Sequence, residues 1–118
     1  MKIKKESLGK MAVFLVPSLK LKKRTKKGKI EDVIHNFLTK NFNSYTVDTG
    51  NIFGYWKENG KEEYDEHRRF TVAFLGKEKI PVLEKFIANI AYSIGEKCIY
   101  LETGEDAWLI YAKKSGLN

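Results

Sequence analysis

The order in which two kinds of apolar repeat alternate along the chain constrains its fold more than any other feature. Apolar residues recur every three or four positions in residues 30–42 and 81–94, as in amphipathic helices. One strand-like segment precedes the first helix, two lie between the helices, and two follow the second. The order β-α-β-β-α-β-β predicts an α/β (α+β) sandwich of the ferredoxin-like βαββαβ type with an added C-terminal hairpin strand. Both helices then lie on one face of an antiparallel sheet.

The ends of both expected helices are marked in the sequence. Glu31 and Asp32 lie in the first turn of the first helix, where the helix dipole favours negative charge. Pro81 fits only the first turn of the second helix, and Gly95 is suited to end it. The second helix is therefore expected to begin close to Pro81 and to stop at Gly95.

Five segments have the composition of strands, and turn residues separate them. Asn59-Gly60 is a strong hairpin-turn dipeptide, residues 48–51 are expected to form a bulge or kink, and the lysine-rich residues 22–29 are expected to be a loop. The expected strands are residues 11–21, 44–56, 67–75, 97–102 and 107–114.

The first and last strands carry apolar residues on both faces. Residues 11–16 are nearly all apolar, so both sides of this strand are expected to be buried, and "AWLIYA" at 107–112 has the same character. Two helices cover only one face of such a sheet. An uncovered apolar face usually packs against another subunit, so we expect a homo-oligomer whose open sheet faces meet around a symmetry axis.

Length and composition bound the class of protein. The 118 residues are expected to form one domain, residues 11–118, preceded by a basic N-terminal arm, residues 1–10. No apolar run reaches the ~18 residues of a membrane span. The single cysteine, Cys98, permits no internal disulfide and indicates a reducing compartment. We therefore expect a cytoplasmic protein with no membrane partner.

The net charge of +7 is unevenly distributed along the chain. Residues 1–29 hold eleven basic residues and one acidic residue, whereas residues 30–118 hold eleven basic and fourteen acidic residues. The basic segments 2–5 and 20–29 have two open interpretations, a contact with phosphate or an acidic partner, and a solvated surface that confers solubility. No aromatic residue is interleaved with these lysines to stack on bases, which disfavours nucleic acid as a partner.

The acidic connection between the second and third strands is the first candidate site. Tyr55 and Trp56 precede it and Glu66 follows it, so Tyr55 and Glu66 are expected to lie near each other across an antiparallel ladder. A carboxylate beside an aromatic ring suits a ribose diol or a cation. The alternative is a solvated hairpin in which Glu66 pairs with a neighbouring arginine. The carboxylates of this connection are Glu58, Glu62, Glu63, Asp65 and Glu66.

A second acidic cluster surrounds the last turn, at Glu102, Glu105 and Asp106. Glu102 ends the fourth strand and is the member of the cluster placed to face a site. The two histidines, His35 and His67, are far apart in sequence and have no metal-ligand spacing. No metal site is therefore expected.

Several segments, taken in order, resemble the phage S-adenosylmethionine (SAM) lyases, the SAMase family first described as SAM hydrolases. The resemblance covers roughly residues 11–114 and rests on the order and spacing of the segments together. They are "AVFLVPSL", "NIFGYWKE", "RRFTVAF", "KEKIPVLEKFIANIAYSIGEKCIYL" and "LIYAKK".

The resemblance implies a GlnB-like homotrimer with active sites at the subunit interfaces. A tyrosine and a glutamate eleven positions apart mark the family's site, and Tyr55 and Glu66 have that spacing. The resemblance thus implies Glu66 and Tyr55 as catalytic residues. Trp56, Glu63 and Glu102 are the candidates for binding substrate, and Glu63 is the reserve candidate for the acidic position.

The activity implied by the resemblance is degradation of SAM without a cofactor. In the lyase reaction the carboxylate of SAM attacks its own γ-carbon and releases methylthioadenosine and homoserine lactone. A hydrolase would instead need Glu66 as general base for a water. In an infected cell such a phage enzyme depletes host SAM in the cytoplasm and counteracts restriction–modification.

Two other classes of function remain open at the level of sequence. One is a GlnB-like regulatory module that binds an adenine ligand without turnover. The other is a nucleic-acid-binding ferredoxin-like domain that uses the basic segments, with an affinity that falls steeply with salt.

Overall fold

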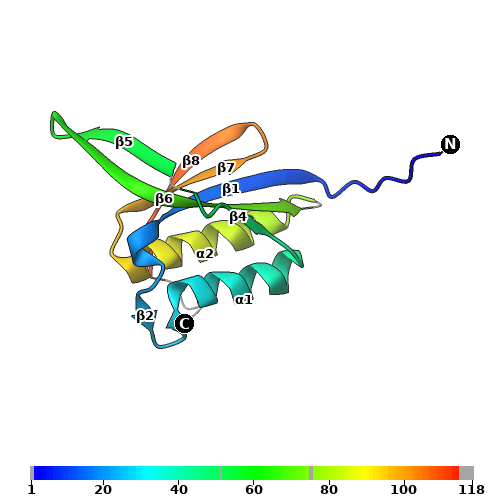
Figure 1. Cartoon of the computed structure of the whole chain (residues 1–118), viewed down its shortest axis with the longest axis horizontal. Helices are drawn as coiled ribbons and strands as arrows, with labels where there is room; N and C mark the ends of the chain where they lie inside the picture. The colour runs from blue at the N-terminus through cyan, green and yellow to red at the C-terminus, as the bar shows by residue number, and fades with distance from the viewer. Residues whose placement is uncertain (1, 51, 75, 115–118) are drawn as a thin grey trace.

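The centre of the molecule is an antiparallel sheet built around strand β1, Lys10–Pro17. The computed structural model describes residues 2–50, 52–74 and 76–114. Strand β6, Lys61–Phe74, pairs with one edge of β1 and β7, Cys98–Thr103, pairs with the other. Strand β8, Asp106–Tyr111, follows β7 as the final hairpin strand, and both helices cover one face (Figure 1). The expected ferredoxin-like sandwich with an added hairpin strand is confirmed.

The outer edge of β6 is covered by two short strands that follow one another along it. β4, Thr46–Val47, pairs with the end of β6, and β5, Ile52–Glu58, pairs with its beginning. Between them the chain leaves the ladder, and the Asp48 N–H still donates to the Arg69 carbonyl at 3.0 Å. The expected kink is therefore present at residues 48–50, while the last residue of the expected range, Asn51, lies outside the described residues.

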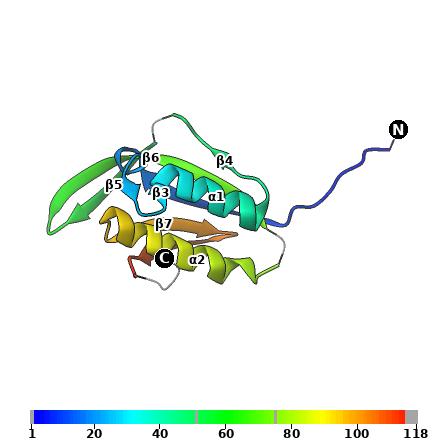
Figure 2. The same cartoon turned by 90° about the horizontal axis from the view of Figure 1, so that it is seen from below.

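The two helices have the boundaries that the sequence predicts. α1 spans Ile30–Phe42 and α2 spans Lys79–Ile94, with Pro81 in its first turn. Gly95 ends α2 in the left-handed conformation, at φ 74°. The helices lie side by side against the sheet (Figure 2), and their apolar stripes fill the core. The largest fully buried core side chains are Phe14, Ile30, Ile34, Leu38, Leu83, Ile87, Ile94, Leu101, Val16 and Val72.

The lysine-rich residues 22–29 are not the loop that the sequence predicts. They contain a small hairpin of β2, Arg24–Thr25, and β3, Gly28–Lys29, in which the Thr25 hydroxyl donates to the Gly28 carbonyl at 2.9 Å. A 3-10 turn, Ser18–Lys20, precedes the hairpin, so the first strand ends at Pro17 and not at residue 21. A ladder only two residues long leaves no alternation of apolar and polar residues by which the sequence could reveal it.

Lysine side chains attach this small hairpin to the end of α2. The Lys20 and Lys23 ammonium groups donate to the carbonyls of Ile94 and Ser93, each at 2.9 Å. The last carbonyls of a helix have no partner within the helix and carry its negative dipole end, so cations there are stabilising. Part of the basic segment 20–29 thus has a structural role.

The sheet keeps one face uncovered in the single chain. Residues of β1 that point toward the helices, such as Phe14, are buried, whereas Met11 on the other side is 59% exposed and Val13 and Leu15 are half-buried. Burial of both sides of β1 is therefore wrong for the isolated chain. Leu109 and Tyr111 of β8 lie on the same open face and are 56% and 57% exposed, so an apolar open face is present as expected.

Residues 2–9 have no regular secondary structure and extend away from the sheet (Figures 1 and 2). The expected arm, 1–10, and domain, 11–118, include residue 1 and residues 115–118, which lie outside the described residues. Within the described part of the chain, no helix is long and apolar enough to cross a membrane.

Candidate active site

The β5–β6 hairpin carries most of the candidate residues and extends beyond the helices (Figure 1). Asn59 and Gly60 form its tip with φ values of 53° and 76°, the pair of positive angles that a type I′ turn requires. Side chains alternate between the two faces of each strand. Even-numbered residues of β6 share the helix-covered side with Phe70, and odd-numbered residues share the open face. Each face of the hairpin thus presents a different set of side chains.

The helix-side face carries an exposed aromatic stripe that leads to Glu66. Tyr55 stands opposite Tyr64, and their rings stack with centroids 5.8 Å apart. Phe53 stands opposite Glu66, with its ring 6.4 Å from that of Tyr64. Tyr55 and Glu66 are therefore diagonal neighbours on one face, not direct partners.

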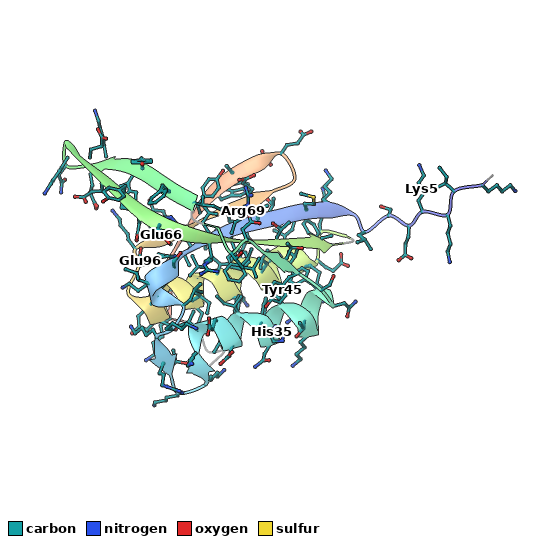
Figure 3. All side chains as sticks on the ribbon, in the orientation of Figure 1. Lys5, His35, Tyr45, Glu66, Arg69 and Glu96 are labelled. Carbon is teal, nitrogen blue, oxygen red and sulfur yellow. The ribbon has the colours of Figure 1, made fainter. Side chains whose placement is uncertain are left out.

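The Glu66 carboxylate has no hydrogen bond or ion pair with any residue that the structure describes. Figure 3 shows Glu66 on the helix side of the sheet and Arg69 on the other. Arg69 instead binds Asp48, with an N–O distance of 2.6 Å. The Nε atom of Arg68, two positions from Glu66 on the same face, is buried and has no hydrogen-bond partner in the described part of the chain. The pairing of Glu66 with a neighbouring arginine is thus absent from the described residues.

Trp56 and Glu63 stand opposite each other on the other face of the hairpin. The five sequence-predicted site residues therefore do not form one cluster within the chain. Glu102 lies on the open face of β7, two positions from Tyr100. Burial raises the pKa of Tyr100, and its side-chain hydrogen bond to Glu102 and the charge of that carboxylate raise it further.

A hollow of about 660 Å³ opens on the uncovered sheet face, between the β5–β6 hairpin and the β7–β8 hairpin. This volume is in the range of pockets for small organic ligands. Its walls are mainly apolar and aromatic. Of the sequence-predicted site residues, Tyr55 and Trp56 belong to the walls, whereas Glu63, Glu66 and Glu102 do not. The aromatic and apolar side chains that strands contribute to the lining are those of Leu15, Tyr55, Trp56, Tyr100, Leu109 and Tyr111, and Gly54 and His67 lie beside them.

Sequence reasoning missed several members of this surface. His67 and Gly54 line the hollow, and Tyr64 completes the aromatic stripe. The alternation of side chains along β6 could have identified His67, because it places His67 and Glu66 on opposite faces of the sheet. Tyr100 and Tyr111 needed the pairing of β7 with β8 to be recognised as neighbours across the hollow.

The part of the chain that the structure describes contains no cluster of metal-ligating side chains. No group of three or more His, Cys, Asp or Glu side chains there is arranged to hold a metal ion. His35, the other histidine, lies on α1 with its Nδ1 2.9 Å from the Tyr45 hydroxyl.

Comparison with known proteins identifies two solved structures of similar fold. No family model matches the sequence, and no curated protein does so either. A phage SAM lyase in its apo state is 15% identical, with a TM-score of 0.61 over 96% of this chain and 98% of that chain. A phage SAM lyase in complex with S-methyl-5′-thioadenosine is 15% identical, with a TM-score of 0.57 over 95% and 97%. The chain therefore has the fold of the phage SAM lyases, as the order of its sequence segments predicts.

Proposed function

We propose that the chain degrades SAM as a lyase, forming methylthioadenosine and homoserine lactone. The observation that carries the proposal is the likeness of fold, over 96% of the chain, to a phage SAM lyase. A second structure of that kind holds S-methyl-5′-thioadenosine, the thioether that this reaction releases. The aromatic hollow on the open sheet face supports the proposal, because flat apolar walls suit a nucleoside.

The proposed reaction asks little covalent chemistry of the protein. A carboxylate oxygen of SAM forms a bond to the γ-carbon while the bond from that carbon to sulfur breaks and its electron pair stays on sulfur. The thioether leaves uncharged and the lactone keeps the ammonium group, so no proton is transferred. The protein supplies a folded conformation of the methionine tail, and effective molarities of well-oriented intramolecular reactions are large.

Charge neutralisation is the second contribution that the site can make. The reacting carboxylate and sulfonium lose their opposite charges in the transition state, so a poorly hydrated site favours the reaction. In this proposal Glu66, which has no partner among the described residues, holds the ribose hydroxyls or the cationic end of SAM. Tyr55 packs on the substrate or donates a hydrogen bond to it, and Trp56 stacks on adenine.

The two remaining carboxylates have subsidiary roles in the proposal. Glu63, opposite Trp56, is the reserve for Glu66 and otherwise contacts substrate at the edge of the hairpin. Glu102 acts through Tyr100, whose hydroxyl it binds beside the hollow. Both are assigned to binding and not to proton transfer, because the lyase reaction requires no base.

We further propose that the protein is a homotrimer with its sites at the subunit interfaces. The exposed apolar side chains of the open face support this, among them Leu109 and Tyr111. The placement of the candidate residues supports it as well. Glu66 and Trp56 lie on opposite faces of one hairpin, so one chain does not bring both to the same substrate. A ring of copies does so if the hollow of one copy receives the Glu66 face of the next.

The test is to incubate the purified protein with SAM and to follow the products by proton NMR. Early appearance of methylthioadenosine together with homoserine lactone supports the lyase, whereas homoserine without lactone indicates a hydrolase. Decarboxylated SAM is the matched control substrate, since it lacks the nucleophile and should remain intact in a lyase. Binding of SAM without any product would leave a ligand-binding module, and neither binding nor product would end the proposal.

The biological role proposed for this activity is phage counter-defence. Loss of SAM in the host cytoplasm would deprive SAM-dependent restriction and methylation enzymes of their substrate. Its measurement is the SAM concentration of cells that express the chain, compared with cells that express the Glu66→Gln variant.

A further inference from the structure

His67 is a polar residue in the wall of the hollow that the proposed reaction does not use. It lies on β6 between Pro17 of β1 and Ile52 of β5, and it lines the hollow. Its Nδ1 atom is buried and has no hydrogen-bond partner among the described residues. A buried polar atom without a partner costs free energy. A ligand in the hollow offsets that cost if the ring turns to present Nδ1, and otherwise it meets the other ring nitrogen, Nε2.

Gly54 provides the space in which this imidazole lies. A Cβ atom added at Gly54 would stand 3.2 Å from the Cε1 atom of His67 and 3.4 Å from its Nδ1. The backbone of Gly54 does not have the positive φ that favours glycine at other positions, such as Gly60. Space for the histidine ring, and not backbone conformation, is therefore the structural demand for glycine in the middle of β5.

The remaining walls of the hollow indicate what the histidine would meet. Trp56, Tyr100 and Tyr111 supply aromatic surface, and Leu15 and Leu109 supply apolar surface. Charged residues line the hollow as well, namely Lys57, Glu58, Glu96 and Lys97. Flat rings suit the faces of a heteroaromatic base, whereas a ring nitrogen suits its polar edge or a sugar hydroxyl. The combination selects a planar group that carries hydrogen-bonding atoms at its rim.

We propose that Gly54 and His67 form a recognition site for the nucleoside half of the substrate, with a ring nitrogen of His67 hydrogen-bonded to the adenosine. Gly54 acts through His67 and is a positioning residue. The inference rests on the proposed function for the identity of the ligand. The inference goes beyond the proposed function because it assigns selectivity for the nucleoside to a residue pair on the face of the hairpin opposite Glu66.

The direct test is a titration of the wild-type protein with methylthioadenosine, followed through the ring nitrogen signals of the histidines. The chain has two histidines, and His35 on α1 is the internal control. We expect the His67 signals to shift with ligand and the His35 signals to stay in place. The proposal would be overturned if the His67 signals shifted with protein concentration but not with ligand. His67 would then contact a second copy of the chain.

Substitutions test how the pair works. His67→Ala is expected to weaken methylthioadenosine binding about tenfold, the loss of one hydrogen bond from a buried group. Gly54→Ala should weaken it in the wild type but have no further effect in the His67→Ala background, since its action runs through the ring. Gly50→Ala is the matched control, because Gly50 has nothing within 4 Å of an added Cβ and no positive φ. Equal effects of Gly54→Ala in both backgrounds would show that Gly54 does not act through His67.

The outcomes separate this inference from the proposed function. If SAM is degraded while the His67 signals ignore methylthioadenosine, the inference fails and the lyase stands. If methylthioadenosine binds and shifts His67 but SAM stays intact, the nucleoside site stands and the lyase fails. If neither ligand binds, both proposals fall.

Discussion

Tyr55 and Trp56 are neighbours in the chain, yet their side chains leave the β5–β6 hairpin on opposite faces. The ring of Tyr55 stacks on Tyr64, whereas Trp56 stands opposite Glu63 on the open sheet face. Both residues border the hollow. A strand imposes this separation on any two consecutive residues. The candidate site is thus divided between two surfaces, and the roles of its members can be tested one face at a time.

Removing the charge of Glu66 is expected to lower the rate of SAM degradation strongly. In the Glu66→Gln variant the loss should be about a hundredfold in kcat/KM, comparable to the removal of a preorganised polar group that stabilises a transition state. Product formation from SAM, followed by proton NMR, measures it. Glu62→Gln is the charge-matched control, because Glu62 is near the hairpin tip on the same face.

The prediction for Glu66 would be contradicted if Glu63, the reserve candidate for the acidic position, proved to be the more important carboxylate. Glu63 is on the Trp56 face, so Glu63→Gln should cost less than Glu66→Gln. If the large loss follows Glu63→Gln and Glu66→Gln stays within a few-fold, the two roles are exchanged. The catalytic carboxylate would then lie on the side of the hollow.

The sequence predicts the fold well because its signals are periodic and local. The helical spacing of Ile30 and Ile34 and the left-handed stop at Gly95 give element types and ends without knowledge of tertiary contacts. The β2–β3 ladder was missed because two residue pairs leave no periodic trace.

The site was predicted less well, because the sequence does not give the pairing register of β5 and β6. An eleven-residue spacing between Tyr55 and Glu66 does not say which residues face each other. The register that places Tyr64 opposite Tyr55 follows from the two-residue turn at the hairpin tip. The contact of His67 with Gly54 needs both that register and side-chain positions.

The pKa of Tyr100 should make stability depend on pH in the alkaline range. Its pKa is raised above the ordinary value of 10.0 in the folded state, so folding favours the protonated hydroxyl. The resulting stabilisation is fully present below pH 10 and is lost as the pH rises through the folded pKa. Tyr100→Phe should therefore flatten the decline in the free energy of unfolding above pH 10, measured by urea denaturation.

A second tyrosine controls for this measurement. Burial also raises the pKa of Tyr45, which lies beside His35 and far from Glu102 in the sequence. The wild-type decline above pH 10 should thus persist in part in Tyr100→Phe. An unchanged slope in that variant would mean that Tyr100 does not contribute to it.

The lysines that bind the end of α2 should contribute to stability and not to catalysis. Lys20→Met and Lys23→Met each remove an ammonium group that donates to a terminal helix carbonyl. We expect each to lower the free energy of unfolding by about 0.5–1 kcal/mol, with SAM turnover of the folded protein unchanged. Urea denaturation measures it, and Lys26→Met, in the turn of the β2–β3 hairpin, is the control. If all three variants had the same free energy of unfolding, the contacts of Lys20 and Lys23 with α2 would not contribute to stability.

Mixed assemblies provide the strongest test of a site shared between copies. If the hollow of one copy receives the Glu66 face of the next, the inactive variants Glu66→Gln and Trp56→Ala should complement each other. Random mixing of the two, by unfolding and refolding together, leaves about a quarter of the interfaces with both native faces in a cyclic ring. SAM turnover should therefore return to about that fraction of the wild-type rate, while each variant refolded alone stays inactive. A mixture that stays inactive, with mixed assemblies demonstrated by native mass spectrometry, would contradict a site that combines the hollow of one copy with the Glu66 face of the next.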